Sequence, residues 1–270
     1  MIESFDQESW VEEAWRNYLT TGENEKERRQ RRVLKFLPGS PRCKGCYAPF
    51  SGAGSVVVRL FYDKRPSNMN PYLCNVCEQF ARQHPGGAEV ELSLLFADVR
   101  GSTSLAEKLG TAQFTRLINR FYRIASQIMV ESDALIDKII GDQVAGIYVP
   151  GFAGAQHARR AIEAGRKLLA ATGHGTATSP WIPLGVGVHT GIAYVGSVGS
   201  KDGTMDITVL GDAANTAARL ASEAKIGEIL ISDAAYRVAN LEPDVLEVRN
   251  LTLKGKSQAV SVHVLSDYIR

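Results

Sequence analysis

The feature that most constrains the fold is an alternation of strand-like apolar runs and amphipathic helical segments between Glu89 and about Tyr268. Alternation of this kind is typical of a sheet covered by helices, so an α/β or α+β layer is expected. The predicted strands lie near residues 90–98, 134–140, 144–149, 183–191, 205–210, 228–231, 244–253 and 258–264. The predicted helices lie near residues 102–109, 111–131, 154–172, 212–224 and 233–239.

Two aspartates stand where predicted strands end. Asp98 closes an apolar run and precedes a turn in which Ser102 or Thr103 can cap the next helix, leaving backbone N–H groups for phosphate oxygens. Asp142 follows Gly141 about forty residues later. Taken singly, either aspartate is consistent with an ordinary strand-end or turn residue. Together, such carboxylates can hold two divalent cations over a polyphosphate, and they would repel each other without a cation. The pair therefore indicates a nucleotide-triphosphate enzyme.

The region Met205–Leu220 supplies further polar side chains. Asp206 and Thr208 are two residues apart on a predicted strand and share one face of it. Asn215 and Arg219 are four residues apart on a predicted helix, again on one face. An amide and a guanidinium pointing the same way suit a ribose and a phosphate. An ordinary amphipathic helix with two polar surface residues has the same spacing.

Known glycine-rich nucleotide motifs do not fit this sequence. Lys254–Ser257 ends like a Walker A loop, but Asn250 stands where that motif needs glycine. The glycines between residues 185 and 203 do not match the dinucleotide-binding fingerprint. A nucleotide is therefore expected to be held by metal ions and scattered side chains.

Four cysteines form two Cys-x-x-Cys pairs separated by 27 residues (47 through 73): Cys43, Cys46, Cys74 and Cys77. Each pair can aim two thiolates at one tetrahedral ion, and two pairs complete a four-sulfur shell. In a reducing compartment this pattern favours a metal site over disulfides. We expect structural Zn²⁺ in a small, loop-rich module over residues 38–87, with an iron–sulfur cluster or a redox dithiol as alternatives.

The N-terminal residues 1–37 are expected to form a helix, because Trp10, Ala14 and Tyr18 recur at four-residue steps. Its charged second half favours a solvated face. A docking or dimerising helix is the alternative, because exposed Trp10 and Trp15 would need a partner. The acidic N-terminus is not a signal peptide, and no apolar run reaches about eighteen residues. With a net charge of +2, a soluble cytoplasmic chain without nucleic-acid or membrane partners is expected.

Five ordered motifs make the chain resemble a class III nucleotidyl cyclase over roughly residues 89–266. They are FADVRGST, KIIGD, GVGVHTG, TVLGDAANTAARL and LKGK. The resemblance implies an α+β fold with a ferredoxin-like βαββαβ core, here assigned to a catalytic domain over residues 88–270. It also implies a homodimer with head-to-tail chains, in which each active site is built from both.

By position, Asp98 and Asp142 resemble the family's two metal-binding aspartates, and the carbonyl of Val99 resembles a further metal ligand. Lys138 matches the lysine that reads adenine. Thr208 falls where many members have a base-reading aspartate, and it resembles a subgroup with threonine there, some of whose members respond to bicarbonate.

The remaining family positions concern the sugar and the phosphates. Asn215 resembles the residue that orients the ribose, Arg219 the one that stabilises the transition state, and Lys254 the one that binds the terminal phosphates. The resemblance thus implies an adenylate cyclase that converts ATP to 3′,5′-cyclic AMP and pyrophosphate with two Mg²⁺ or Mn²⁺ ions per site. Lys138 favours ATP over GTP. The alternatives are a guanylate cyclase, a catalytically silent nucleotide- or effector-binding module, and a zinc-ribbon nucleic-acid adaptor.

Overall fold

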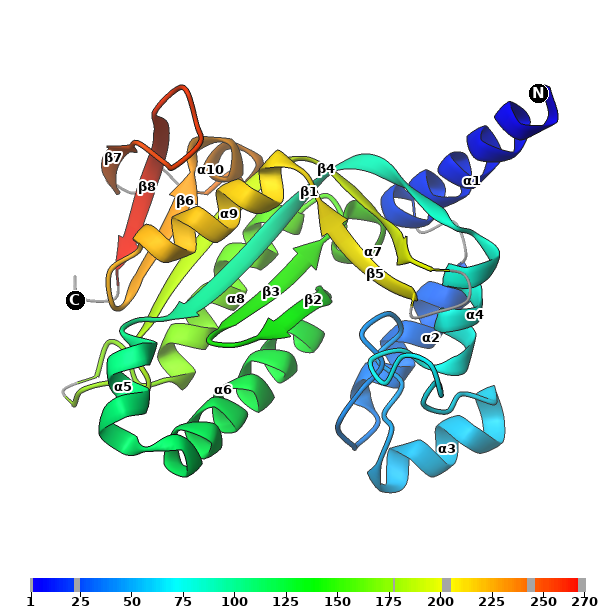
Figure 1. The fold of residues 1–270 in the computed structure, drawn as a ribbon, viewed down its shortest axis with the longest axis horizontal. Coiled ribbons are helices and arrows are strands. Elements are labelled where there is room, and N and C mark those ends of the chain that lie inside the picture. The colour runs from blue at the N-terminus through cyan, green and yellow to red at the C-terminus, as the bar shows by residue number, and fades with distance from the viewer. Residues whose placement is uncertain (1, 22–24, 177, 201–204, 242–245, 267–270) are drawn as a thin grey trace. The chain divides into compact units, whose positions relative to one another are not determined.

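A computed structural model describes residues 2–21, 25–176, 178–200, 205–241 and 246–266 (Figure 1). The chain divides into two compact units. Unit 1 comprises Met1–Val90, Pro150–Phe152 and Tyr194–Leu210, and unit 2 comprises Glu91–Val149, Ala153–Ala193 and Gly211–Arg270. Unit 1 is therefore assembled from three separate stretches of sequence. In the described part of the chain, no helix combines the length and the apolar character needed to cross a membrane.

The strands form one sheet in the order β2-β3-β1-β4-β6-β8-β7, with β5 paired to β4. Their bounds are β1 Gly86–Val99, β2 Leu135–Ile140, β3 Gln143–Tyr148, β4 Leu184–Gly199, β5 Met205–Leu210, β6 Glu228–Ser232, β7 Glu247–Leu251 and β8 Val260–Ser266. The first four strands lie in the order β2-β3-β1-β4, which is the order of a ferredoxin-like βαββαβ unit. The predicted α+β fold class is confirmed.

The helices of unit 2 cover both faces of the sheet. They are α5 Ser102–Leu109, α6 Thr111–Glu131, α8 His157–Ala171, α9 Asp212–Glu223 and α10 Asp233–Ala239. On β6, Ile229 belongs to the core that contains α6 and α8, whereas its neighbour Leu230 packs with Leu220 of α9. Because side chains alternate along a strand, α9 lies on the face opposite α6 and α8 (Figure 1).

The position of α9 depends on glycine in β4. A Cβ on Gly187 would lie 2.3 Å from the Ala221 nitrogen and 2.6 Å from the Ala217 oxygen, both backbone atoms of α9. Val186 and Val188 instead belong to the core cluster that includes α8. In the alternating sequence GVGVH, the glycines therefore lie on the face where α9 packs closely. The valines lie on the opposite face and form a branched apolar surface.

Unit 1 contains four helices in its described residues: α1 Ile2–Thr20, α2 Glu25–Phe36, α3 Gly52–Tyr62 and α4 Asn75–Gln83. The short helix α7 Pro150–Ala153 begins in this unit. The single N-terminal helix expected up to residue 37 is thus two helices, and the cysteine region contains α3 and α4. Trp15 is fully buried, with its indole nitrogen donating to the His84 carbonyl at 3.0 Å. The expectation that Trp15 is exposed was wrong, because α4 covers it through Phe80. Trp10 is 58% exposed.

Strand β4 is longer than expected because its second half pairs with another strand. Its second half pairs antiparallel with β5, from Tyr194↔Leu210 to Gly199↔Met205. The predicted strand near 183–191 is only the part that lies in unit 2, and the hairpin formed with β5 belongs to unit 1. Each strand of this hairpin is therefore packed within the same unit as the cysteines.

Candidate active site and cysteine centre

The two predicted metal-binding aspartates come together at one end of the β1–β3 pair. Strands β1 and β3 are antiparallel, and Asp98 stands opposite Gln143. The backbone nitrogen of Val99 donates to the Asp142 carbonyl at 3.0 Å. The turn before Asp142 needs a left-handed residue, which Gly141 supplies with φ of 64°. The β2–β3 turn thus delivers Asp142 beside the end of β1.

Asp98 is 9% exposed, and its neighbours carry charges of both signs. Burial raises the pKa of its carboxyl, the guanidinium of Arg100 opposes that rise, and the negative charge of Asp142 adds to it. Arg100 donates to Asp98 Oδ2, and the Ser222 hydroxyl approaches the same oxygen at 3.4 Å. A cation would relieve both the burial cost and the repulsion, so this donor set fits a divalent metal ion.

Arg100 is the residue that the sequence analysis missed. It is placed two residues after Asp98, and it also donates to the carbonyl of Ser222 at the end of α9. Its backbone nitrogen donates to the Pro183 carbonyl at 2.9 Å. The sequence did contain a signal for this role, because Arg100 is a basic residue two positions after a carboxylate whose charge has to be balanced.

Asp142 is held by the start of α5. The Ser102 hydroxyl donates to Asp142 Oδ2. The N-cap of α5 is Gly101, without a side-chain cap hydrogen bond, so the expectation that Ser102 or Thr103 caps this helix was wrong. Ser102 is used to orient the carboxylate instead.

The second group of predicted residues lies on α9 and the loop before β8. A Cβ on Gly255 would lie 3.2 Å from a guanidinium nitrogen of Arg219, so that side chain lies against the loop that carries Lys254. Lys256 pairs with Asp212 at the start of α9, which ties the same loop to the helix. Asn215 and Lys254 are exposed. The Arg219 guanidinium therefore lies beside the residue that directly follows Lys254.

The two predicted base-reading residues are in different units. Lys138 lies in β2, where its backbone pairs with Ala145 after a register shift, and its side chain is outside the described part of the chain. Thr208 lies in β5 opposite Gly196, in unit 1. Thr208 is 9% exposed, and its buried hydroxyl has no hydrogen-bond partner among the described residues. Asp206, two residues earlier on the strand, contacts Lys44 and Asn70.

The four predicted cysteine ligands converge in unit 1. Their sulfur atoms lie within 4.8 Å of one another, and Cys46 and Cys74 are separated by 3.7 Å between sulfurs. Backbone nitrogens turn toward the sulfurs, with Cys74 N 3.2 Å from Cys43 Sγ and Cys77 N 3.5 Å from Cys74 Sγ. Four free thiols packed this closely fit a tetrahedral metal ion.

Lys64 is a buried cation beside these thiols, 6% exposed. Burial by itself lowers the pKa of Lys64, but the negative charges of the four cysteines outweigh it and the pKa is raised. Because a four-thiolate shell around a divalent ion carries excess negative charge, a neighbouring ammonium suits such a site.

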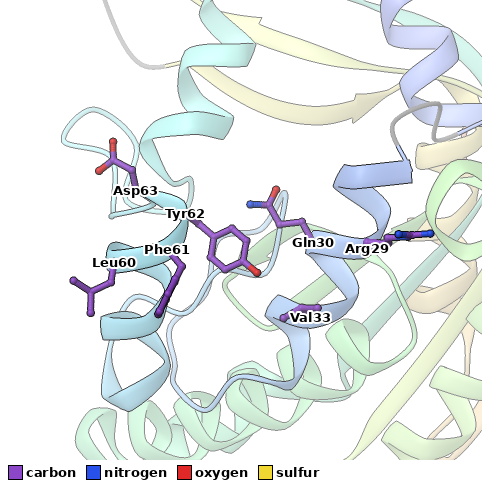
Figure 2. Close-up of a pocket in the computed structure, with 7 residues that line it drawn as sticks. All are labelled: Arg29, Gln30, Val33, Leu60, Phe61, Tyr62 and Asp63. Atoms are coloured by element: carbon purple, nitrogen blue, oxygen red, sulfur yellow. The ribbon is translucent and has the colours of Figure 1, made fainter.

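Unit 1 also has a hollow of about 590 Å³ between α2 and α3. Figure 2 shows it lined by Arg29, Gln30 and Val33 of α2 and by Leu60–Asp63 of α3, with the Tyr62 ring directed toward α2. None of these residues is a predicted site residue, so this hollow is separate from the candidate active site.

Residues 88–267 match the family described as adenylate and guanylate cyclase catalytic domain. The chain belongs to this family, whose class III members use divalent metal ions.

Similar proteins include an adenylate cyclase of Anabaena cylindrica, 30% identical over 193 residues, or 64% of this chain and 36% of that protein. A terminal-differentiation-specific adenylate cyclase of Dictyostelium discoideum is 28% identical over 65% of this chain and 9% of its own length. The chain therefore matches only a minor part of these relatives.

Among solved structures, the adenylyl cyclase CyaB of P. aeruginosa is similar with a TM-score of 0.57 and 30% identity, covering 67% of this chain and 96% of that one. The guanylate cyclase domain of RhGC from Catenaria anguillulae, solved with GTP, has a TM-score of 0.56 and 24% identity, covering 66% and 98%. The second similarity supports the fold alone.

Proposed function

We propose that the chain is an adenylate cyclase that converts ATP to 3′,5′-cyclic AMP and pyrophosphate. The observation that carries the proposal is the convergence of Asp98 and Asp142 at the end of β1 and β3 in a chain of the cyclase family. Asp98, Asp142 and the carbonyl of Val99 would hold two Mg²⁺ or Mn²⁺ ions. When bound, such ions lower the pKa of a ribose hydroxyl and neutralise a triphosphate.

The protein side chains would bind and orient the substrate. Asn215 orients the ribose, and Lys254 binds the terminal phosphates. In the reaction the 3′-oxygen bonds to the α-phosphorus, the bond to pyrophosphate breaks, and the hydroxyl proton passes to water or to the substrate. The Arg219 guanidinium, held against Gly255, offsets the negative charge that builds at the α-phosphate. Ser102 keeps the Asp142 carboxylate oriented, which preserves the metal-binding geometry.

We further propose that Lys138 and Thr208 read the adenine. The unpartnered Thr208 hydroxyl supports this role, because a buried hydroxyl without a partner gains from a ligand that supplies one. Asp206, the other candidate, is already paired with Lys44. A guanylate cyclase is the second candidate function, because the matched family contains both adenylate and guanylate cyclases.

The cysteine centre is proposed to hold structural Zn²⁺ in a module over residues 38–87, between an N-terminal helical segment (1–37) and a catalytic domain (88–270). The proposed active unit is a homodimer in which each site takes residues from both chains. The close packing of the four thiols and the buried Lys64 support the metal site.

The test is an assay of the purified chain with Mg²⁺ or Mn²⁺ and either ATP or GTP, with products identified by mass spectrometry. Metal-dependent cyclic AMP with pyrophosphate is the expected result. Cyclic GMP as the main product would favour the guanylate cyclase. Binding of nucleotide without any cyclic product would favour the silent module.

A further inference from the structure

The cysteine module makes three direct contacts with β5, the strand that carries Thr208. The first comes from the turn between Cys43 and Cys46. Lys44 lies within this turn, is 7% exposed, and pairs its ammonium with Asp206 Oδ1. Since an ion pair with one buried partner is lost only at a cost, the turn and the strand are tied together.

The second contact comes from the segment between the two cysteine pairs. Asn70 is 2% exposed, and its side-chain nitrogen donates to the Met205 carbonyl at 2.9 Å and to Asp206 Oδ1 at 3.2 Å. The Asn70 backbone carbonyl accepts from the nitrogen of Leu73, which directly precedes Cys74. The position of Asn70 thus depends on the second cysteine turn.

The third contact is apolar, and a fourth reaches the partner strand of the hairpin. Ile207 packs against the small core that contains Cys43 and Cys74. On β4, the Ser197 hydroxyl donates at 2.8 Å to the Ala81 carbonyl of α4, the helix that begins just after Cys74. Both strands of the β4–β5 hairpin are therefore attached to elements fixed by the cysteines.

We propose that metal bound by the four cysteines fixes the position of the Thr208 hydroxyl through Lys44 and Asn70, so that the cysteine module sets nucleotide selectivity. This inference rests on the proposed function. A module of this size has a small core of its own, and loss of the metal releases both cysteine turns. Lys44 and Asn70 then lose their fixed positions, and the start of β5 loosens beside Thr208. Lys44 and Asn70 act as positioning residues.

The test compares Lys44→Gln with Arg59→Gln, a control on the exposed face of α3 in the same module. Metal content, hydrogen exchange of the amides in residues 205–210, and the ratio of ATP to GTP turnover are measured for each. Lys44→Gln is expected to retain its metal, to speed exchange in β5 on the order of tenfold, and to lower the ATP to GTP ratio, because a charge-assisted hydrogen bond is lost. Arg59→Gln is expected to match the unmutated chain in all three.

Metal removal by a chelator provides a second, independent arm. Stripped protein is expected to show fast exchange in residues 205–210 and slow exchange in β1 and β3. Unchanged exchange in residues 205–210, either after stripping or in Lys44→Gln, would overturn the inference that the cysteine module holds β5. An unchanged ratio of ATP to GTP turnover in Lys44→Gln would overturn the inference about selectivity. Because exchange needs no catalysis, an inactive unmutated chain would count against the proposed function alone, and exchange would still decide whether the module holds β5.

Discussion

At the scale of single residues, Asp98 combines a structural cost with a proposed catalytic use. Burial and the neighbouring Asp142 both raise its pKa, and Arg100 offsets them only in part, so the charged form is held at some cost until a metal ion binds. We predict that Asp98→Asn lowers cyclase activity by on the order of 10³-fold, because the negative charge of a metal ligand is lost. The free energy of unfolding measured in urea should fall little, because the amide oxygen can still accept from Arg100 and the cost of burying a charged carboxylate is removed. Asp63→Asn, at an exposed aspartate, is the control and should retain activity. Retention of most of the activity by Asp98→Asn would contradict the proposed role.

His189 in β4 gives a prediction about pH. Burial, helped by the positive charge of Lys256 and opposed by Asp212, lowers the pKa of His189 to about 4. The unfolded chain therefore binds this proton more tightly than the folded one. The associated stability is fully present above about pH 6.5 and is lost as the pH falls through about 4, at most about 3 kcal/mol.

His189→Gln removes this titration and keeps a polar side chain near the Ser232 hydroxyl, which His189 contacts at 2.8 Å. Urea unfolding at a series of pH values between 7 and 4 should therefore show a shallower loss of stability in the variant. Equal slopes in the two proteins would show that His189 does not control acid sensitivity.

At the scale of elements, the approach of α9 to β4 fixes where Asn215 and Arg219 lie. We predict that Gly187→Ala destabilises the fold by about 1–3 kcal/mol, because the new Cβ meets two backbone atoms of α9. Cyclase activity should fall in the folded protein as well, because the helix must shift. Gly146→Ala is the matched control, since its Cβ meets the flexible end of Met129 at 3.3 Å. Thermal unfolding and turnover are measured on both variants. Equal stability and equal activity of the two variants would contradict the prediction.

Sequence patterns predicted elements well where the periodicity was local. The alternation of Val and Gly in β4 and the apolar run before Asp98 each predict a strand. The burial of Trp15 was not predictable, because it depends on α4, a helix far along the chain. The extension of β4 beyond residue 191 depends in the same way on pairing with β5.

For the candidate site, the positions of Asp98 and Asp142 at the ends of predicted strands correctly predicted that the two residues are neighbours. It did not show that Arg100 neutralises Asp98 or that Lys44 engages Asp206, since ion pairs form between side chains whose meeting depends on the tertiary fold. Polar contacts of this kind have no periodic signature in a sequence.

At the scale of the whole molecule, the proposed homodimer makes a quantitative prediction. Asp98→Ala and Arg219→Ala proteins should each be nearly inactive when alone. In the proposed homodimer each site would take Asp98 from one chain and Arg219 from the other. After mixing and exchange of subunits, about one quarter of the unmutated activity is expected, because half of the dimers pair unlike chains and each of these has one intact site of two. Activity that stays at the level of the separate variants would indicate that each chain builds its own site.

The discontinuous make-up of unit 1 has a practical consequence for anyone who trims this protein. The family match starts at residue 88, yet the segment Tyr194–Leu210 packs on residues that precede that boundary. A fragment cut there would keep every proposed catalytic side chain and would bare Ile207 and the polar groups that Asn70 and Ala81 now satisfy. Such a fragment should aggregate and lose activity quickly in solution. This instability would result from the exposed apolar and polar groups, and not from a defect in the catalytic residues.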